Sequence, residues 1–269
     1  MAQFASISPT ALMRCIGTPQ APVIIDVCID EDFADDPFPI PTARRVPHMK
    51  IGDLSAELKD KNTVIVCQKG RKLSHGAAAH LRSLGIRSEV LEGGNVAWRT
   101  AGLPRVPAAV LPPASPGSRW VTRWRPKIDR IACPWLIRRF IDPAASFLFV
   151  PPAEVLAVAE KFDAIPFDVP DTRWSHQGRD CTFDTMLAGF GLDTAALAKM
   201  AQVIRAADTN AHARVHEAAG LRALASGLSR GVRDDLAQLD AGMVLYDALY
   251  RWARDGQSET HDWQAEVAS

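Results

Sequence analysis

Residues 63–74 have the sequence T-V-I-V-C-Q-K-G-R-K-L-S, and this stretch decides the expected fold of the first half of the chain. The apolar, β-branched run at 64–66 is typical of a buried strand. Cys67 follows where that strand would end, and a polar loop with one glycine and three positive charges follows the cysteine. Ser74 is the expected cap of a helix that continues to about residue 84. The stretch therefore predicts a strand, a cysteine, a basic loop and a helix, in that order.

This arrangement suggests a chemical role for the Cys67 thiol. The loop that would surround it consists of Gln68, Lys69, Gly70, Arg71, Lys72 and Leu73. Successive backbone N–H groups of such a loop can converge on an anion, and a helix N-terminus adds partial positive charge. A thiol placed there should ionise more easily than free cysteine, and the thiolate is the nucleophile. We therefore expect Cys67 to be catalytic and residues 68–73 to form an anion-binding loop. The alternative is an inert core cysteine, since cysteine is among the residue types most often buried.

Composition limits the classes of protein that fit. A chain of 269 residues can form two domains, and 47% hydrophobic with 23% charged residues is ordinary for a globular protein. The net charge is zero, so no overall field attracts nucleic acid or membranes. Five scattered cysteines without a C-x-x-C pair argue against a disulfide framework and a zinc ribbon. Because the first residues do not resemble a signal peptide and no apolar run is long enough for a membrane span, we expect a cytoplasmic protein without a membrane partner.

The order of the expected elements predicts two domains. Strands at 23–27, 46–51, 64–66 and 88–91, a loop at 30–41 and intervening helices predict an α/β domain with a parallel sheet over residues 1–104. Five prolines between residues 103 and 117 predict a stiff linker at 105–118. Residues 119–255 should form a second, mainly α-helical (α+β) domain, with strands at 147–150 and 165–169. Residues 256–269 would be a polar tail.

The start of the second domain is both basic and aromatic. Residues 119–139 contain seven basic residues and three tryptophans. The candidate binding residues in this run are Arg123, Arg125, Lys127, Arg130, Cys133 and Arg138. They could form a solvated face over a core of tryptophans, a nucleic-acid surface, or a site for a small oxyanion. Cys133-Pro134 is expected to open or kink a helix, because proline suits the first helical position, and this would place Cys133 near a helix N-terminus, where the pKa of a thiol falls.

A metal site is a further candidate in the second domain. His176, Asp208 and Glu217 supply the imidazole and carboxylate groups that hold a divalent transition metal. His212 and His216 are four residues apart and would share a helical face. The alternative is that these side chains are exposed or pair with the many arginines.

The first half resembles the rhodanese domain family. The resemblance rests on C-Q-K-G-R-K-L-S at 67–74, L-E-G-G-N-V-A-W-R-T-A-G-L-P at 91–104, V-I-I-D-V at 23–27 and I-P-T-A-R-R-V-P at 40–47. It implies that Cys67 accepts a sulfane sulfur and becomes a persulfide, without a cofactor. Lys72 stands where the family usually has arginine. Cys28 and Thr42 also differ from the common family residues, arginine and glycine.

The second half resembles the C-terminal domain of the chromate-resistance protein ChrB. The matching stretches are 120–142, 165–170, 175–184, 206–209, 217–221 and 242–250. The matching polar positions are Lys127, Asp129, Arg130, Cys133, Arg138, His176, Cys181, Asp184, Asp208, Glu217 and Asp247. The resemblance implies a role in chromate resistance, as a regulator or as an accessory enzyme.

Three functions are compatible with these features. The first is a sulfurtransferase in chromate or oxyanion resistance, with thiosulfate or chromate as its small oxyanion. The second is a chromate-responsive, DNA-binding transcriptional regulator that binds promoter DNA through the basic run at 119–139. The third is a metal-dependent function of the second domain. A homodimer is compatible with each of them.

Overall fold

The first domain is built on a five-stranded sheet in which all strands are parallel. The computed structural model describes residues 5–112, 117–209 and 215–258. The strands lie in the order β1-β5-β4-β2-β3. Their bounds are β1 Ser6–Ile7, β2 Val23–Asp26, β3 Arg44–Arg45, β4 Thr63–Val66 and β5 Ser88–Leu91. In the centre, Ile25 of β2 lies beside Ile65 of β4. The predicted parallel α/β architecture is confirmed.

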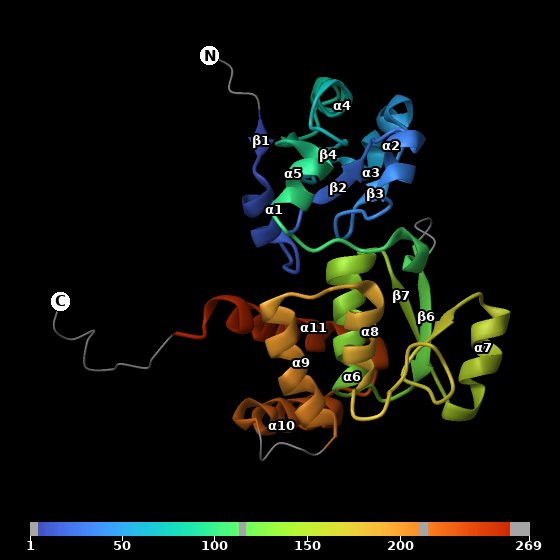
Figure 1. The fold of residues 1–269 in the computed structure, drawn as a ribbon. Helices are drawn as coiled ribbons and strands as arrows, with labels where there is room; N and C mark the ends of the chain where they lie inside the picture. Colours follow the sequence, from blue (N-terminus) through green and yellow to red (C-terminus); the bar gives the residue numbers. More distant parts are fainter. Residues whose placement is uncertain (1–4, 113–116, 210–214, 259–269) are drawn as a thin grey trace.

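Helices cover both faces of this sheet (Figure 1). They are α1 Pro9–Cys15, α2 Asp30–Asp35, the 3-10 helix η1 His48–Leu54, α3 Ser55–Leu58, α4 Lys72–Ser83 and α5 Gly94–Thr100. Two local predictions were wrong. The loop expected at 30–41 contains α2, since three acidic residues in its first turn favour a helix N-terminus. The strand expected at 46–51 is η1, because Pro47 has no N–H to donate to a sheet.

The second domain combines a small sheet with a larger group of helices. Its parallel strands lie in the order β7-β6-β8, with bounds β6 Arg119–Arg123, β7 Ser146–Val150 and β8 Ile165–Pro166. Its helices are α6 Asp129–Leu136, the π-helical turn η3 Ile137–Ile141, η4 Pro152–Glu154, α7 Val155–Lys161, α8 Thr182–Phe190, α9 Ala195–Asp208, α10 His216–Gly231 and α11 Asp235–Asp255. Helix α7 covers one side of the sheet, and α6 and α8 lie on the other (Figure 1). The predicted mainly helical α+β domain is confirmed. The strand expected at 165–169 is shorter than predicted, because β8 ends at Pro166 and Asp168 has a positive φ of 53°.

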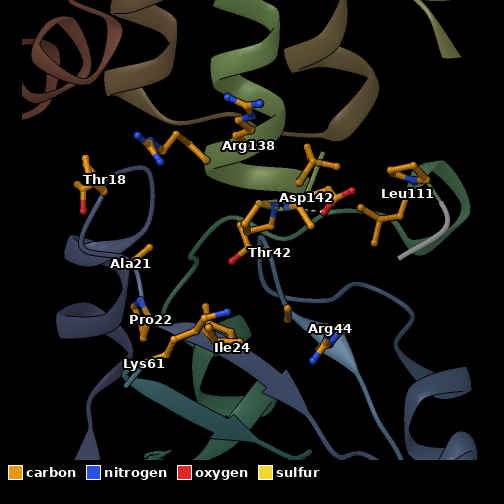
Figure 2. Close-up of a pocket in the computed structure, with 18 of the residues that line it drawn as sticks. Thr18, Ala21, Pro22, Ile24, Thr42, Arg44, Lys61, Leu111, Arg138 and Asp142 are labelled. Carbon is orange, nitrogen blue, oxygen red and sulfur yellow. Dashed lines mark hydrogen bonds between the residues drawn. The ribbon is translucent and has the colours of Figure 1, made fainter. Parts of the chain in front are cut away.

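The two domains share one hydrophobic core. Leu12 and Ile16 of α1 belong to the same buried cluster as Phe140 and Tyr250 of the second domain. The N–H of Thr42 donates to the carbonyl oxygen of Phe140 at 3.0 Å, which joins the domains through the backbone. A cavity of about 510 Å³ remains at the junction. Figure 2 shows Arg138 and Asp142 on one side of it, with Thr42 and Ile24 on the other.

The segment between the domains contains the short 3-10 helix η2 Ala108–Val110 and packs against the first domain. Val106 and Ala108 donate to the carbonyl oxygens of Pro39 and Pro37, at 3.0 and 2.9 Å. Of the polar tail expected at 256–269, residues 259–269 lie outside the described part of the chain. Among the residues that the structure describes, every helix is too short or too polar to cross a bilayer.

Candidate functional site

Cys67 lies at the carboxyl end of β4, immediately before the basic loop. Its side chain has 5% of its surface exposed. The Sγ atom accepts a hydrogen bond from the backbone N–H of Arg71 at 3.4 Å and lies 3.2 Å from Ser74 Oγ. Ser74 is not the cap predicted from the sequence, because α4 already begins at Lys72. Its hydroxyl instead donates to the carbonyl oxygen of Arg71 at 3.0 Å and contacts the thiol.

The start of α5 holds the loop in place. The N–H groups of Asn95 and Val96 donate to the carbonyl oxygens of Cys67 and Gln68, at 3.1 and 3.0 Å. Gly94 makes this approach possible, since its φ is +60° and a Cβ there would collide with the Cys67 carbonyl oxygen and the Gly70 nitrogen. The two carbonyl groups are therefore turned toward α5, and the N–H of Arg71 is turned toward the thiol.

The loop presents positive charge to solvent. Lys69, Arg71 and Lys72 are exposed, while Gln68, Gly70 and Leu73 are half-buried. None of the three basic side chains forms an ion pair with a carboxylate in the described part of the chain. The loop therefore carries three charges close to the N-terminus of a twelve-residue helix, and such a terminus favours anions.

A second cysteine lies on the neighbouring strand end. The side-chain amide of Asn95 donates to Asp26 Oδ2 at 3.0 Å and contacts Cys28 Sγ at 3.4 Å. Burial and the Asp26 carboxylate raise the pKa of the Cys28 thiol far above its usual range. Cys28 is therefore protonated at neutral pH.

In the second domain, the basic run divides into separate groups. Arg123 and Arg130 both pair with Asp168, at 2.8 and 3.3 Å. Together with Lys127 they line a cavity of about 380 Å³. Arg125 turns elsewhere and donates to the carbonyl oxygens of Ser229 and Val232, which ties β6 to the end of α10.

Arg138 lies apart from the others, at the domain junction in Figure 2. It donates to the carbonyl oxygen of Ala145 and pairs with Asp240, both at 3.3 Å. Trp120 and Trp135 are buried, and Trp124 is half exposed. Two of the three tryptophans therefore lie in the core, as one of the three interpretations expected, but most arginines of the run contact other elements of the second domain instead of forming a solvated face.

The prediction for Cys133 was wrong. Cys133 is the fifth residue of α6, which begins at Asp129 and includes Pro134 in its interior. Its side chain is fully buried. Burial, followed by the charge of Asp129, raises the pKa of the Cys133 thiol instead of lowering it. Pro134 did not mark the start of this helix.

His176 and Asp208 come together, as the metal hypothesis required. The Nε2 atom of His176 lies 3.3 Å from Asp208 Oδ2, 3.4 Å from Asp129 Oδ2 and 3.5 Å from Asp168 Oδ1. Glu217 is not part of this cluster. Its Oε1 atom lies 4.0 Å from Lys199 Nζ. His216 begins α10, and His212 lies outside the described residues.

The charged groups of this cluster shift one another's pKa values. A hydrogen bond to Asp129 and the neighbouring carboxylates raise the pKa of His176 to about 9, against the opposing effect of burial. Burial and the charges of Asp129 and Asp168 raise the pKa of Asp208 to about 6. His176 is therefore protonated at neutral pH and its charge faces Asp129 and Asp208, while Arg123 and Arg130 pair with Asp168.

Comparison with known proteins assigns both halves of the chain. Residues 8–101 match the model of the rhodanese-like domain, and residues 120–253 match that of the ChrB C-terminal domain. The chain carries a rhodanese-like domain followed by a ChrB C-terminal domain. The match to the second family includes the whole His176 cluster, and the match to the first includes Cys67 and its loop.

Individual relatives cover only part of the chain. Protein ChrB of Cupriavidus metallidurans is 38% identical over 135 residues, which are 50% of this chain and 40% of that protein. A rhodanese-related protein from Thermoplasma volcanium is 24% identical and covers 38% of this chain and 98% of its own, with a TM-score of 0.33. A rhodanese-like domain protein from Staphylococcus aureus is 30% identical and covers 35% of this chain and 91% of its own, with a TM-score of 0.32.

Sequence reasoning missed two members of the cluster in the ChrB C-terminal domain. Asp129 and Asp168 were not predicted to lie beside His176, although both fall within stretches that resemble the family. The available signal was that Asp129 is the single acidic residue between positions 119 and 139. A lone carboxylate among seven basic residues points to a specific role.

Proposed function

We propose that the rhodanese-like domain is a sulfurtransferase in which Cys67 is the nucleophile. The observation that carries this proposal is the hydrogen bond from the Arg71 N–H to Cys67 Sγ at 3.4 Å, at the start of α4. A thiolate at that position is stabilised by a backbone donor and by the positive end of the helix. Lys69 and Lys72 form no ion pair among the described residues, and their charges favour an anionic sulfur donor.

The expected reaction has two steps. The Cys67 thiolate attacks the sulfane sulfur of thiosulfate, a new S–S bond forms, and sulfite leaves with the electron pair of the broken S–S bond. An acceptor such as cyanide then attacks the outer sulfur of the persulfide, thiocyanate leaves, and the thiolate is restored. No net oxidant or reductant is consumed, and no metal or organic cofactor is needed for these steps.

The second domain supports a wider role in resistance to chromate or a related oxyanion. Its match to the ChrB C-terminal domain motivates this part of the proposal. Thiosulfate and chromate are both tetrahedral dianions, so a loop that attracts one has the charge to attract the other. We therefore expect sulfur transfer and oxyanion handling to serve the same stress response.

Intact mass spectrometry after thiosulfate treatment tests the chemistry directly. The wild-type protein should gain the mass of one sulfur atom, and Cys67→Ser should gain none. Cys15→Ser is the matched control, because it removes a partly exposed thiol of α1, outside the loop. Equal sulfur uptake by Cys67→Ser and wild type would exclude Cys67.

Turnover gives a second measurement of the same proposal. Cyanide-dependent release of thiocyanate should require Cys67 and should persist in Cys15→Ser. In cells, wild type but not Cys67→Ser should restore growth on chromate to a strain that lacks the gene. Full restoration by Cys67→Ser, with the persulfide confirmed in the wild type, would separate sulfur transfer from chromate resistance.

A further inference from the structure

Four polar side chains from three segments of the ChrB C-terminal domain come together at a single point. Asp129 is the first residue of α6, Asp208 is the last residue of α9, and Asp168 and His176 lie between β8 and α8. The three carboxylates all lie within 3.5 Å of His176 Nε2. This arrangement lies in the second domain and does not involve Cys67.

We propose that Asp129, His176 and Asp208 bind a divalent transition-metal ion. One donor atom from each of these residues lies within 4.8 Å of the other two. Bonds of about 2.0–2.2 Å to such an ion would hold these atoms about 3.0–3.6 Å apart. The distances of 3.3 Å and 3.4 Å from His176 Nε2 to Asp208 and Asp129 already fall in that range.

An unsatisfied oxygen gives an independent reason to expect a ligand. Asp129 is 1% exposed. Its Oδ2 accepts the backbone N–H of Thr182 at 2.6 Å, which fixes the carboxylate at the start of α8. Its Oδ1 is buried and has no hydrogen-bond partner among the described residues. Buried carboxylate oxygens are ordinarily paired or bound to a metal, and a cation that binds both oxygens of the Asp129 carboxylate would satisfy this one.

The donor set indicates the class of ion. Imidazole nitrogen suits first-row transition metals, and two carboxylates add hard oxygen donors, so the site should accept Mn²⁺, Fe²⁺ or Zn²⁺. It should bind Mg²⁺ and Ca²⁺ less well, because these ions prefer oxygen ligands alone. Soft Cu⁺ would lack the sulfur donors that it prefers, because the described residues whose donor atoms come together here include no cysteine.

Asp168 would act as a positioning residue rather than as a ligand. Its Oδ2 pairs with Arg123 and Arg130, and its Oδ1 accepts the hydroxyl of Thr182 at 3.0 Å. These contacts occupy the carboxylate and hold it against His176. The two arginines also line the cavity of about 380 Å³ beside the cluster.

The cavity leaves room for a further ligand on the metal. His176 is 42% exposed, so the cluster opens toward solvent on that side. Three protein ligands leave coordination positions free for water or a small anion. Arg123, Lys127 and Arg130 face the same cavity and would favour an anion there.

Metal binding by the full chain tests the proposal without any assay of activity. Protein made without a histidine tag is treated with a chelator, dialysed and titrated with MnCl₂ or ZnCl₂ by calorimetry. We expect one metal ion per chain, and Mn²⁺ bound at the site should lose the sharp electron paramagnetic resonance spectrum of the free ion. MgCl₂ and CaCl₂ should bind at least about tenfold more weakly.

Variants then locate the ion. His176→Gln and Asp208→Asn should each weaken binding by about 100-fold or more, which is at least the loss seen when even an outer partner is removed. Glu217→Gln is the matched control on α10 and should bind like wild type. Asp208→Asn keeps the size of the side chain, so it remains informative if His176→Gln does not fold.

Three outcomes would overturn the assignment. They are no uptake of Mn²⁺ or Zn²⁺, unchanged affinity in a folded Asp208→Asn protein, and binding of Mg²⁺ or Ca²⁺ as tight as that of the transition metals. Loss of binding in Glu217→Gln would place the ion elsewhere. Sulfur uptake by Cys67 should be the same in all these variants, so failure here would leave the sulfurtransferase proposal intact.

Discussion

A single methyl group at position 94 should disable the loop around Cys67. Gly94 has a φ of +60°, and a Cβ there would meet the carbonyl oxygens of Cys67 and Gln68 and the nitrogen of Gly70. All three atoms belong to the backbone, so no flexible side chain can move aside. Gly94→Ala must therefore push the loop away from α5.

The size of the effect follows from the contacts that would be lost. A left-handed backbone costs alanine roughly 1–2 kcal/mol. The hydrogen bonds from Asn95 and Val96 to the loop carbonyls contribute about 0.5–1.5 kcal/mol each. If both break, the variant is destabilised by about 2–5 kcal/mol relative to wild type. The displaced loop also moves the Arg71 N–H away from the thiolate, and a hydrogen bond to a charged group is worth about 1.5–3 kcal/mol, so the rate of sulfur transfer should fall at least roughly tenfold.

Two measurements on two variants examine this reasoning. Thiocyanate release reports on the loop, and urea unfolding reports on stability whether or not the domain is an enzyme. Gly76→Ala is the matched control, because a Cβ at this position of α4 meets nothing within 4 Å. Alanine in a helix interior should leave the rate unchanged and raise stability by up to about 1 kcal/mol.

If Gly94→Ala keeps the wild-type rate and the wild-type unfolding midpoint, α5 does not hold the loop. If stability falls while the rate is unchanged, the loop geometry is real but does not govern sulfur transfer.

Further predictions concern the second domain. Arg125→Ala should lower the free energy of unfolding by about 1–3 kcal/mol in urea, because Arg125 ties β6 to the end of α10; an unchanged midpoint would instead support a role at the surface. Asp247→Ala should cost about 2–4 kcal/mol by the same assay, since Asp247 accepts two hydrogen bonds from Arg139 at 2.8 Å, with side chains only 16% and 21% exposed. Asp247→Asn, which keeps an acceptor, should cost less. Because burial raises the pKa of Cys133, its thiol should resist alkylation in native protein up to about pH 9, where free cysteine is largely ionised; rapid labelling detected by peptide mass mapping would contradict this.

Local sequence determined much of the rhodanese-like domain. The β-branched run before Cys67, the glycine in the basic loop and the alanine-rich segment after it predicted the strand, turn and helix that the structure contains. The helix at 182–190 and its end at Gly191 were also predictable, because apolar spacing and a C-terminal glycine are local signals. These features depend on residues within a few positions of one another.

Only the tertiary structure determined the cluster around His176 and the contacts of the basic residues at 119–139. Asp129 and Asp208 are far apart in the chain, and only the packing of α6 against α8 and α9 brings them to His176. In the same way, Arg125 could be seen as basic but not as bound to carbonyl groups of α10, and Cys133 could be seen beside a proline but not as buried. Charge and helical periodicity depend on residues that are close in the sequence. The burial of a side chain and the identity of its contact partners depend on which distant segments pack together.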